Sequence, residues 1–260
     1  MFAEERYTKI GDLVAAEGRV SVAALAERFN ITQETVRRDL AALEADGMVR
    51  RVHGGAVPAG KMSTSEQSLS SRQTQNHDQK ARIARKALEL IPSSSSVVID
   101  AGTTTELLAD LLQDWQPANP GDDLLVITHA VPIAAKLANS STIQLEMLGG
   151  RVRGLTRAGV GDRTISQIED LRPDIAFIGT NGVHAGFGLS TPDPQEAAVK
   201  TAIVHSARRV VALADSSKLD EETLVRFAHL KEIDALITDV EPSAELAGAL
   251  RDAGTEVVLA

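Results

Sequence analysis

The sequence of 260 residues contains no cysteine. This absence excludes disulfides, thiolate metal sites and a cysteine nucleophile, and it fits a reducing compartment. The chain also lacks any apolar run close to the roughly 20 residues that span a bilayer. Its N-terminus lacks the basic-then-apolar order of a signal peptide. We therefore expect a cytoplasmic protein that makes no membrane contact.

Basic residues are fewer than acidic ones: Lys and Arg total 27 against 36 Asp and Glu, which gives a formal net charge of -9. Taken over the whole chain, this balance argues against a protein that coats nucleic acid or an anionic membrane. The charge is unevenly distributed, however. Residues 1–58 carry 8 basic and 9 acidic residues, whereas residues 76–260 carry 17 basic and 26 acidic residues. The acidity therefore belongs almost entirely to the long C-terminal part, and the N-terminal part is nearly neutral.

A polar segment divides the sequence. Residues 58–77 are rich in Ser and Gln and contain few large apolar residues, so they can bury little surface to offset the entropy of ordering. We expect this segment to be a linker. It would join a small domain, residues 1–57, to a larger one, residues 78–260.

The small domain has the pattern of a helix-turn-helix. Apolar residues recur at helical spacing in three successive segments. Ser21 and Thr32 precede the second and third of these, and both are good N-caps because their hydroxyls accept from the free N–H groups of the next turn. Only Asn30 and Ile31 separate the two helices, so residues 20–39 are predicted to form the motif.

A β-hairpin, the wing of a winged domain, is predicted after the third helix at residues 48–57. Recognition helices present their N-terminal residues to the major groove, where Arg can contact guanine or phosphate and Gln suits adenine. Arg37 and Arg38 project from this helix, although a surface pairing with Glu34 and Asp39 is the alternative. The predicted DNA-contacting residues are Ser21, Thr32, Gln33, Thr35, Arg37, Arg38, Arg50, Arg51 and His53.

Two motifs carry a family resemblance, namely Thr35-Val36-Arg37-Arg38-Asp39-Leu40 and Arg51-Val52-His53-Gly54-Gly55-Ala56. Together with flanking matches, they resemble the DNA-binding domain of the DeoR family of bacterial transcription regulators. The match runs from residue 3 to about residue 57 without a gap. It implies that double-stranded operator DNA is a partner.

The larger domain alternates short apolar strands with helices, which predicts an α/β fold with a mostly parallel sheet. Strands are expected at 97–100, 124–128, 143–148, 174–178, 209–214, 235–238 and 256–259. Helices are expected at 78–91, 105–114, 130–138, 194–207 and 243–252. Ligands of such sheets bind at the carboxyl ends of the strands, so the residues that follow each strand matter most.

Several strand ends carry side chains suited to a phosphate. Residues 101–105 form a small-residue loop at a helix start, which offers N–H groups, hydroxyls and a favourable dipole. The loop lacks the Walker spacing, so hydrolysis of a nucleoside triphosphate is not expected. Lys218 is a candidate cation or an ordinary surface lysine, and Glu196 and Lys200 are candidate ligand contacts or a surface pair. His129 is a candidate donor or base, or a structural residue.

The strand ends Asp100-Ala101-Gly102-Thr103-Thr104-Thr105, Leu148-Gly149-Gly150 and Asp215-Ser216-Ser217-Lys218 resemble the sensor domain of the DeoR family. That domain is similar in fold to ribose-5-phosphate isomerase and glucosamine-6-phosphate deaminase, and it binds phosphorylated sugars. The resulting prediction of the effector pocket comprises Asp100, Gly102, Thr103, Thr104, Thr105, His129, Gly149, Gly150, Arg151, Glu196, Lys200 and Lys218. The family usually has Asn where this chain has His129, so the identity of the effector stays open.

The resemblance implies a repressor of a sugar or polyol catabolic operon whose operator binding responds to a phosphorylated sugar. No metal, cofactor or enzymatic activity is expected, and a homodimer or homotetramer would read repeated half-sites. One alternative is a sugar-phosphate isomerase or deaminase fused to a DNA-binding module, in which Asp100, His129 and Glu196 transfer protons. Another is an interaction module with a vestigial pocket.

Overall fold

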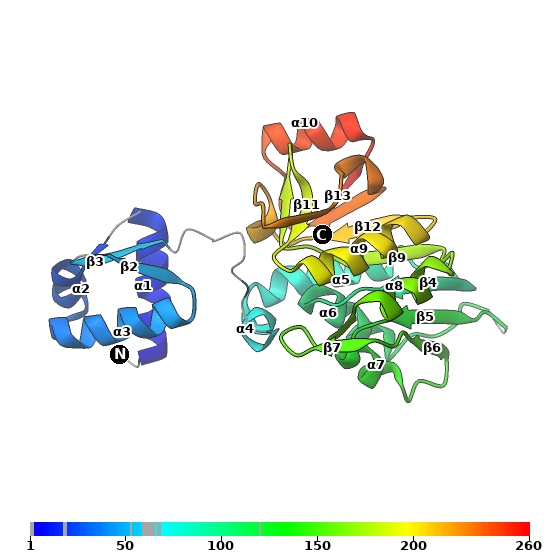
Figure 1. The fold of residues 1–260 in the computed structure, drawn as a ribbon, viewed down its shortest axis with the longest axis horizontal. Coiled ribbons are helices and arrows are strands. Elements are labelled where there is room, and N and C mark those ends of the chain that lie inside the picture. Colours follow the sequence, from blue (N-terminus) through cyan, green and yellow to red (C-terminus); the bar gives the residue numbers. More distant parts are fainter. Residues whose placement is uncertain (1–2, 18–19, 53, 59–65, 67–68, 120) are drawn as a thin grey trace. The chain divides into compact units, whose positions relative to one another are not determined.

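The computed structural model describes residues 3–17, 20–52, 54–58, 66, 69–119 and 121–260. The chain divides into two compact units, residues 1–67 and 68–260 (Figure 1). None of the helices within the described ranges has the length and apolar character needed to cross a bilayer.

In the described part of the N-terminal unit, three helices pack with a small antiparallel sheet. Its elements are α1 (Ala3–Glu17), β1 (Val20–Ser21), α2 (Val22–Phe29), α3 (Gln33–Ala45), β2 (Val49–Val52) and β3 (Gly55–Pro58). The apolar residues at helical spacing form the core, with Ile10, Leu25, Val36, Leu40 and Leu43 fully buried. The predicted helix-turn-helix is confirmed, because residues 30–32 alone separate α2 from α3.

Local contacts explain why these helices begin and end where they do. The Ser21 hydroxyl accepts from the Ala24 N–H at 3.1 Å, and the Thr32 hydroxyl accepts from the Thr35 N–H at 3.1 Å. Asn30 ends α2 in the left-handed conformation, with φ 52°. Each of these residues supplies what a helix terminus lacks, a side-chain acceptor at the start or a reversal of the backbone at the end.

The wing is anchored by a close backbone approach. β2 and β3 pair antiparallel, and β3 also pairs with β1, where Ser21 lies opposite Gly55. A Cβ atom on Gly55 would lie 2.0 Å from the Val20 carbonyl oxygen, so a larger residue would push β3 away from β1. Gly55 of the sequence motif therefore permits β3 to lie against β1.

A seven-stranded parallel sheet forms the centre of the described C-terminal unit, with the order β15-β14-β12-β9-β4-β5-β6. Its strands are β4 (Ser95–Ile99), β5 (Leu124–Thr128), β6 (Ile143–Met147), β9 (Ile175–Gly179), β12 (Val210–Leu213), β14 (Ala235–Thr238) and β15 (Glu256–Leu259). Every segment predicted as a strand belongs to this sheet, so the predicted architecture is confirmed. The strand order reverses between β4 and β9, the position where open α/β sheets bind ligands.

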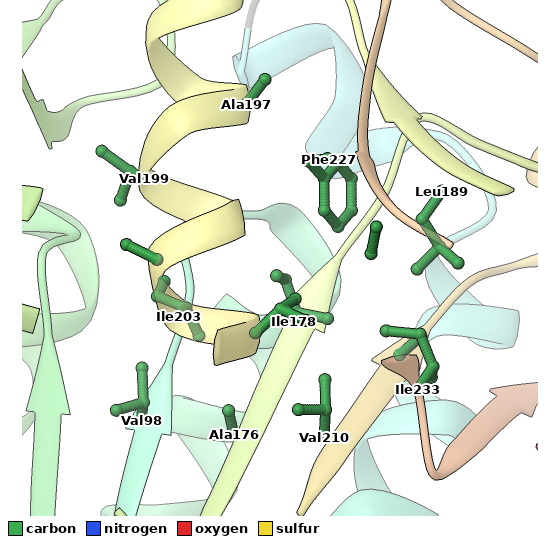
Figure 2. Close-up of a cluster of buried hydrophobic side chains, with 14 of the residues drawn as sticks. Val98, Ala176, Ile178, Leu189, Ala197, Val199, Ile203, Val210, Phe227 and Ile233 are labelled. Carbon is green, nitrogen blue, oxygen red and sulfur yellow. The ribbon is translucent and has the colours of Figure 1, made fainter. Parts of the chain in front are cut away.

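Helices cover both faces of this sheet. Successive residues of a strand point to opposite sides, so each strand contributes to two apolar clusters. On one face, Val98, Ala176 and Val210 pack near Val199 and Ile203 of α9 (Figure 2). On the other, the strands pack against α5, α6 and α7. The bounds are α5 (His77–Leu88), α6 (Thr103–Leu112), α7 (Val131–Leu137), α9 (Pro194–Ser206) and α10 (Ala244–Ala253), the last also packing on the α9 side.

Several short elements differ from the sequence-based expectation. They are α4 (Leu69–Thr74), α8 (Asp162–Glu169), the hairpin β7 (Arg151–Arg153) with β8 (Ala158–Val160), and the sheet of β10 (Gly182–His184), β11 (Gly188–Thr191) and β13 (Val225–Ala228). α4 lies inside the expected linker, residues 58–77, but it belongs to the C-terminal unit. The structure therefore groups residues 69–77 of the expected linker with the C-terminal unit, where both polar contacts and the buried Leu69 hold α4 in place.

Candidate nucleic-acid interface and ligand cavity

The face of α3 that points away from the core carries Gln33, Arg37 and Arg38, and all three are exposed. Arg37 Nη1 lies 3.4 Å from Glu34 Oε2, and these side chains are 58% and 74% exposed. Surface pairs of this kind contribute only about 0–1 kcal/mol, so the guanidinium can exchange its partner for a phosphate or a base. Gln33 and Arg37 also line a hollow together with Arg51 of the wing.

Asp39 has a structural partner instead of Arg38. Its carboxylate accepts from Arg6 of α1 through two hydrogen bonds, Nε to Oδ2 at 2.5 Å and Nη2 to Oδ1 at 3.0 Å. The hydrogen bonds to Asp39 raise the pKa of Arg6. Asp39 is buried and bound to Arg6 of α1, so it does not form the surface pair with Arg38 that the sequence left as an alternative. Arg38 remains exposed on α3.

The other described residues predicted to contact DNA lie at the starts of α2 and α3 and on the wing. Ser21 and Thr32 cap their helices, and the Thr35 hydroxyl is 2.8 Å from the Thr32 hydroxyl. Arg51 is exposed and its Nε lies 2.8 Å from Glu44 Oε2 at the end of α3. Arg50 occupies β2 opposite Val57. His53 lies outside the described residues.

A cavity with about 50 Å³ of water-accessible space, partly open to solvent, lies at the carboxyl ends of β4, β9 and β12. It is therefore at the point where the strand order reverses. The lining residues are Leu69, Arg72, Gln75, Asn76, Lys80, Ala101, Gly102, Thr103, Thr104, Thr156, Gly179, Thr180, Asn181, Glu196, Lys200, Leu213, Asp215, Ser217 and Lys218.

The charge of this cavity favours an anion. Among its described lining residues, the cations Arg72, Lys80, Lys200 and Lys218 exceed the carboxylates Glu196 and Asp215 by two. Gly102, Thr103 and Thr104 add the first turn of α6, where backbone N–H groups have no acceptor within the helix. Cations and free N–H groups together suit a phosphate group.

Asp100 is fully buried behind the cavity wall, and its carboxylate contacts Lys200, Gly179 and His129. Its Oδ2 accepts from Lys200 and from the Gly179 N–H, the latter at 3.0 Å, and its Oδ1 lies 3.0 Å from His129 Nε2. Burial alone would raise the pKa of Asp100, but the Lys200 charge and the His129 hydrogen bond outweigh it and lower that pKa. Lys200 also donates to the Gly179 carbonyl at 2.9 Å. Asp100 thus fixes the position of Lys200 in the wall.

His129 lies behind the wall as well and is only 2% exposed. Its Nδ1 is 2.8 Å from the Gly159 carbonyl oxygen of β8, so Nδ1 donates there. Its Nε2 faces Asp100 and the Ala101 N–H, the latter at 3.3 Å. The ring therefore joins β8 to the end of β4. It lies outside the cavity lining, whereas the sequence analysis predicts that His129 contacts the effector.

Glu196 lines the cavity at the start of α9. Its Oε1 accepts from the Thr156 hydroxyl and from Arg153 Nη1, the second at 3.1 Å. Arg153 also pairs with Asp193, the N-cap of α9, at 3.2 Å. Glu196 and Lys200 are buried, so the alternative of a solvated surface pair does not apply. Glu196 instead attaches the β7–β8 hairpin to α9.

The other predicted effector residues have structural positions outside the lining. The Thr105 hydroxyl donates to the Gly102 carbonyl at 2.9 Å and is fully buried. Gly150 has φ +157°, and a Cβ atom on it would lie 2.0 Å from the Thr164 hydroxyl. Gly149 bonds Gln167 through its N–H and carbonyl, and Arg151 donates to Gln195. The glycine pair thus positions the turn between β6 and β7 against α8.

Residues that the sequence analysis did not predict also line the cavity. Lys80 is 4% exposed, and its Nζ donates to the Arg72 and Gln75 carbonyls at 2.6 and 2.7 Å. Asp215 accepts from Asn76 Nδ2 at 2.8 Å. Asp215 belongs to the stretch Asp215-Ser216-Ser217-Lys218 that resembles the sensor domain, whereas no local pattern marks Lys80 or Asn76 as cavity residues.

Two family models match the chain. A DeoR-like helix-turn-helix domain matches residues 6–61, and a DeoR C-terminal sensor domain matches residues 75–240. The HTH-type transcriptional regulator GlpR of Haloferax volcanii is 36% identical over 259 residues, which are 99% of this chain and 98% of that protein. The glycerol-3-phosphate regulon repressor of Escherichia coli K12 is 30% identical over 249 residues, 95% of each chain.

Among solved structures, the chain is similar to ribose 5-phosphate isomerase A of Methanocaldococcus jannaschii. The TM-score is 0.39 at 19% sequence identity, over 55% of each chain.

Proposed function

The chain belongs to the DeoR family of transcriptional regulators, and from that membership we propose that it is a repressor whose operator binding responds to a phosphorylated sugar or polyol. The helix-turn-helix and wing bind operator DNA, and the cavity of the C-terminal unit binds the ligand. The ligand must have a different affinity for two arrangements of the protein, because only such a difference shifts the equilibrium between them. Couplings of this kind are typically about 1–3 kcal/mol.

The observation that carries the ligand class is the chemistry of the cavity wall. Two excess cations and the first turn of α6 favour a phosphate dianion. Thr103, Thr104 and Asn181 line the same cavity and offer hydroxyl and amide groups for the hydroxyls of a sugar or polyol. The printed name of one relative, glycerol-3-phosphate regulon repressor, supports the same ligand class.

The alternative of an isomerase or deaminase has less support. Among the proton-transfer candidates Asp100, His129 and Glu196, the cavity lining contains Glu196. The Glu196 carboxylate already accepts from Thr156 and Arg153. Turnover of an aldose or ketose phosphate that is lost in Glu196→Ala would overturn the regulator-only proposal.

A symmetric homodimer or homotetramer fits this role. A single winged domain contacts too few base pairs for specificity within a genome. Symmetric copies would place two recognition helices on repeated half-sites about one helical turn, or a multiple of it, apart. Operator half-sites with that spacing are therefore part of the proposal.

A thermal-shift screen with sugar and polyol phosphates tests the ligand assignment. A ligand present at about 100 times its Kd should stabilise the protein by about 2.7 kcal/mol, which is visible as a raised Tm. Lys218→Ala should weaken this stabilisation and keep operator affinity, because Lys218 lines the cavity. Lys231→Ala is the matched control, since Lys231 is an exposed lysine outside the lining. Failure of the whole panel to stabilise the protein would contradict the proposal.

Arg37→Ala and Arg38→Ala should each weaken operator binding by about 1–3 kcal/mol if the side chain reads a base. If it contacts phosphate, the loss should be similar on all sequences, with a salt dependence reduced by about one counterion. Titration of labelled DNA at several salt concentrations distinguishes the two. Arg28→Ala is the control, because Arg28 is an exposed arginine on α2 paired with Glu17. Wild-type affinity in both α3 variants would remove the recognition-helix assignment.

Ligand binding should weaken above about pH 8. Burial lowers the pKa of Lys80 to about 8, and the Lys218 and Arg72 charges act in the same direction against Asp215. A bound anion favours the ammonium form and raises this pKa again. The affinity for glycerol 3-phosphate should therefore fall by less than about twofold from pH 7 to 8 and then by up to about tenfold per pH unit. Calorimetry measures this, and a flat profile in the wild type, matching that of Lys80→Met, would contradict it.

A further inference from the structure

The first segment of the C-terminal unit forms one wall of the cavity. Leu69, Arg72, Gln75 and Asn76 belong to α4 and the turn after it, and all four line the cavity. In the sequence, this is the segment at which the chain leaves the DNA-binding unit and enters the C-terminal unit. A ligand in the cavity therefore touches the part of the C-terminal unit that is nearest in sequence to the DNA-binding unit.

α4 depends on tertiary contacts for its position. It has six residues, with the sequence Leu-Ser-Ser-Arg-Gln-Thr, and helices of this length and Ser/Thr content are not stable alone. The Lys80 ammonium binds the carbonyls of Arg72 and Gln75, near the C-terminal end of the helix. Gln73 Nε2 donates to Glu106 Oε2 of α6 at 3.0 Å. Leu69 is 6% exposed beside Ile133 and Pro132.

Like charges meet at this wall. Lys80 is a buried cation, and Arg72 and Lys218 line the same cavity. Asp215 opposes them, held by Asn76 and Ser217. A phosphate dianion would offset the excess positive charge and could accept a third hydrogen bond from Lys80, because an ammonium has three donors and two go to the carbonyls. The anion would thus favour the arrangement in which Lys80 donates to the Arg72 and Gln75 carbonyls.

We propose that Lys80 and Gln73 are positioning residues that couple the cavity to the chain leading to the DNA-binding unit. Ligand binding fixes Lys80 and Arg72, and through the two carbonyls it fixes α4 against α6. When the cavity is empty, α4 separates from α6 more often. The ligand therefore lowers the conformational freedom of the segment that leads to the helix-turn-helix. This inference rests on the proposed function, because it requires an anionic ligand in the cavity.

Hydrogen exchange of the full-length protein tests the first step. Saturating glycerol 3-phosphate or ribose 5-phosphate, whichever stabilises the protein more in the thermal-shift screen, should slow amide exchange of residues 69–76 about tenfold. Lys80→Met should lose this protection when the ligand is raised until it saturates the variant. Unchanged exchange of this segment, under a ligand that alters DNA affinity, would overturn the coupling and leave the proposed function intact. Absence of binding by any phosphate ester would overturn both.

Gln73 variants test the second step, because Gln73 lies outside the cavity lining. Gln73→Glu places a carboxylate against Glu106 and should loosen α4 from α6. The ligand Kd should change by less than about threefold, while the ratio of operator Kd with and without ligand should fall at least about threefold. A DNA fragment selected from a random library with the full-length protein serves as the operator probe. The control is Gln113→Glu, which removes a similar bond, Gln113 Nε2 to Asp110 Oδ1 at 3.2 Å, on α6 but away from α4. Equal ratios in wild type and Gln73→Glu would overturn the proposal.

Discussion

Lys200→Met is expected to lower the free energy of unfolding of the C-terminal unit by about 3–5 kcal/mol, because it leaves the Asp100 charge buried without its cationic partner. Asp100 is 0% and Lys200 4% exposed. The remaining partners of Asp100, His129 and the Gly179 N–H, offset part of this cost. Trp115 is the single tryptophan and lies in the C-terminal unit, so its fluorescence in urea follows this transition.

The double variant Asp100→Asn with Lys200→Met separates a charge effect from a packing effect. The amide oxygen introduced in place of the carboxylate would still accept from the Gly179 N–H, and Met would fill much of the space of the lysine stem. Neutral replacements of a buried pair often restore most of the stability, so the double variant should be more stable than Lys200→Met alone. Lys136→Met is the control, because Lys136 is 27% exposed and pairs near the surface with Glu106 and Asp110. A double variant no more stable than the single one would contradict a charge-based cost.

The parts of the fold that were predictable have buried, continuous apolar strands. β5 and β14 have the same bounds as the predicted segments, because a strand covered on both faces reads as an apolar run. The edge strand β15 also has the predicted bounds, although its residues are partly or fully exposed. α4 and α8 carry few apolar residues, and their positions depend on contacts such as Gln73 with Glu106 that join distant parts of the sequence. No periodicity in the sequence encodes such contacts.

The cavity was partly predictable for the same reason. The rule that ligands bind at strand ends leads to Gly102, Thr103 and Lys218, which do line the cavity. The rule does not distinguish a residue that faces the cavity from one directly behind it, as His129 and Asp100 are. The side chain that follows a strand can turn toward neighbouring strands, and here the fully buried Asp100 turns toward Gly179 and His129.

The Arg-Arg-Asp motif of α3 likewise combines two roles that the sequence does not separate. Arg37 and Arg38 are exposed, whereas Asp39 is buried against Arg6, which is 33 residues earlier in the sequence. Helical spacing predicts that Asp39 turns away from Arg38, but it does not supply the identity of the partner. We expect a change at any residue of this motif to reduce DNA binding, so affinity alone cannot distinguish the two roles.

Asp39→Ala is expected to lower the free energy of unfolding of the N-terminal unit by about 3 kcal/mol. The substitution leaves the Arg6 guanidinium, whose side chain is 11% exposed, without either acceptor oxygen. At roughly 0.05–0.15 kcal/mol per residue, a unit of 67 residues has about 3–10 kcal/mol of stability. The substitution should therefore remove between about a third and nearly all of the stability of the N-terminal unit. Tyr7 is the single tyrosine and packs on this core, so tyrosine emission reports its unfolding.

The comparison with Arg37→Ala decides between structure and recognition. Asp39→Ala should lower both the stability of the N-terminal unit and the operator affinity, while the Trp115 transition of the C-terminal unit stays unchanged. Arg37→Ala should lose affinity and keep the tyrosine transition, because its surface pair with Glu34 contributes little to stability. Asp39→Asn, which retains one acceptor for Arg6, should fall between wild type and Asp39→Ala in stability. A stable Asp39→Ala unit with reduced DNA affinity would instead mean that Asp39 acts at the DNA surface, contrary to its burial against α1.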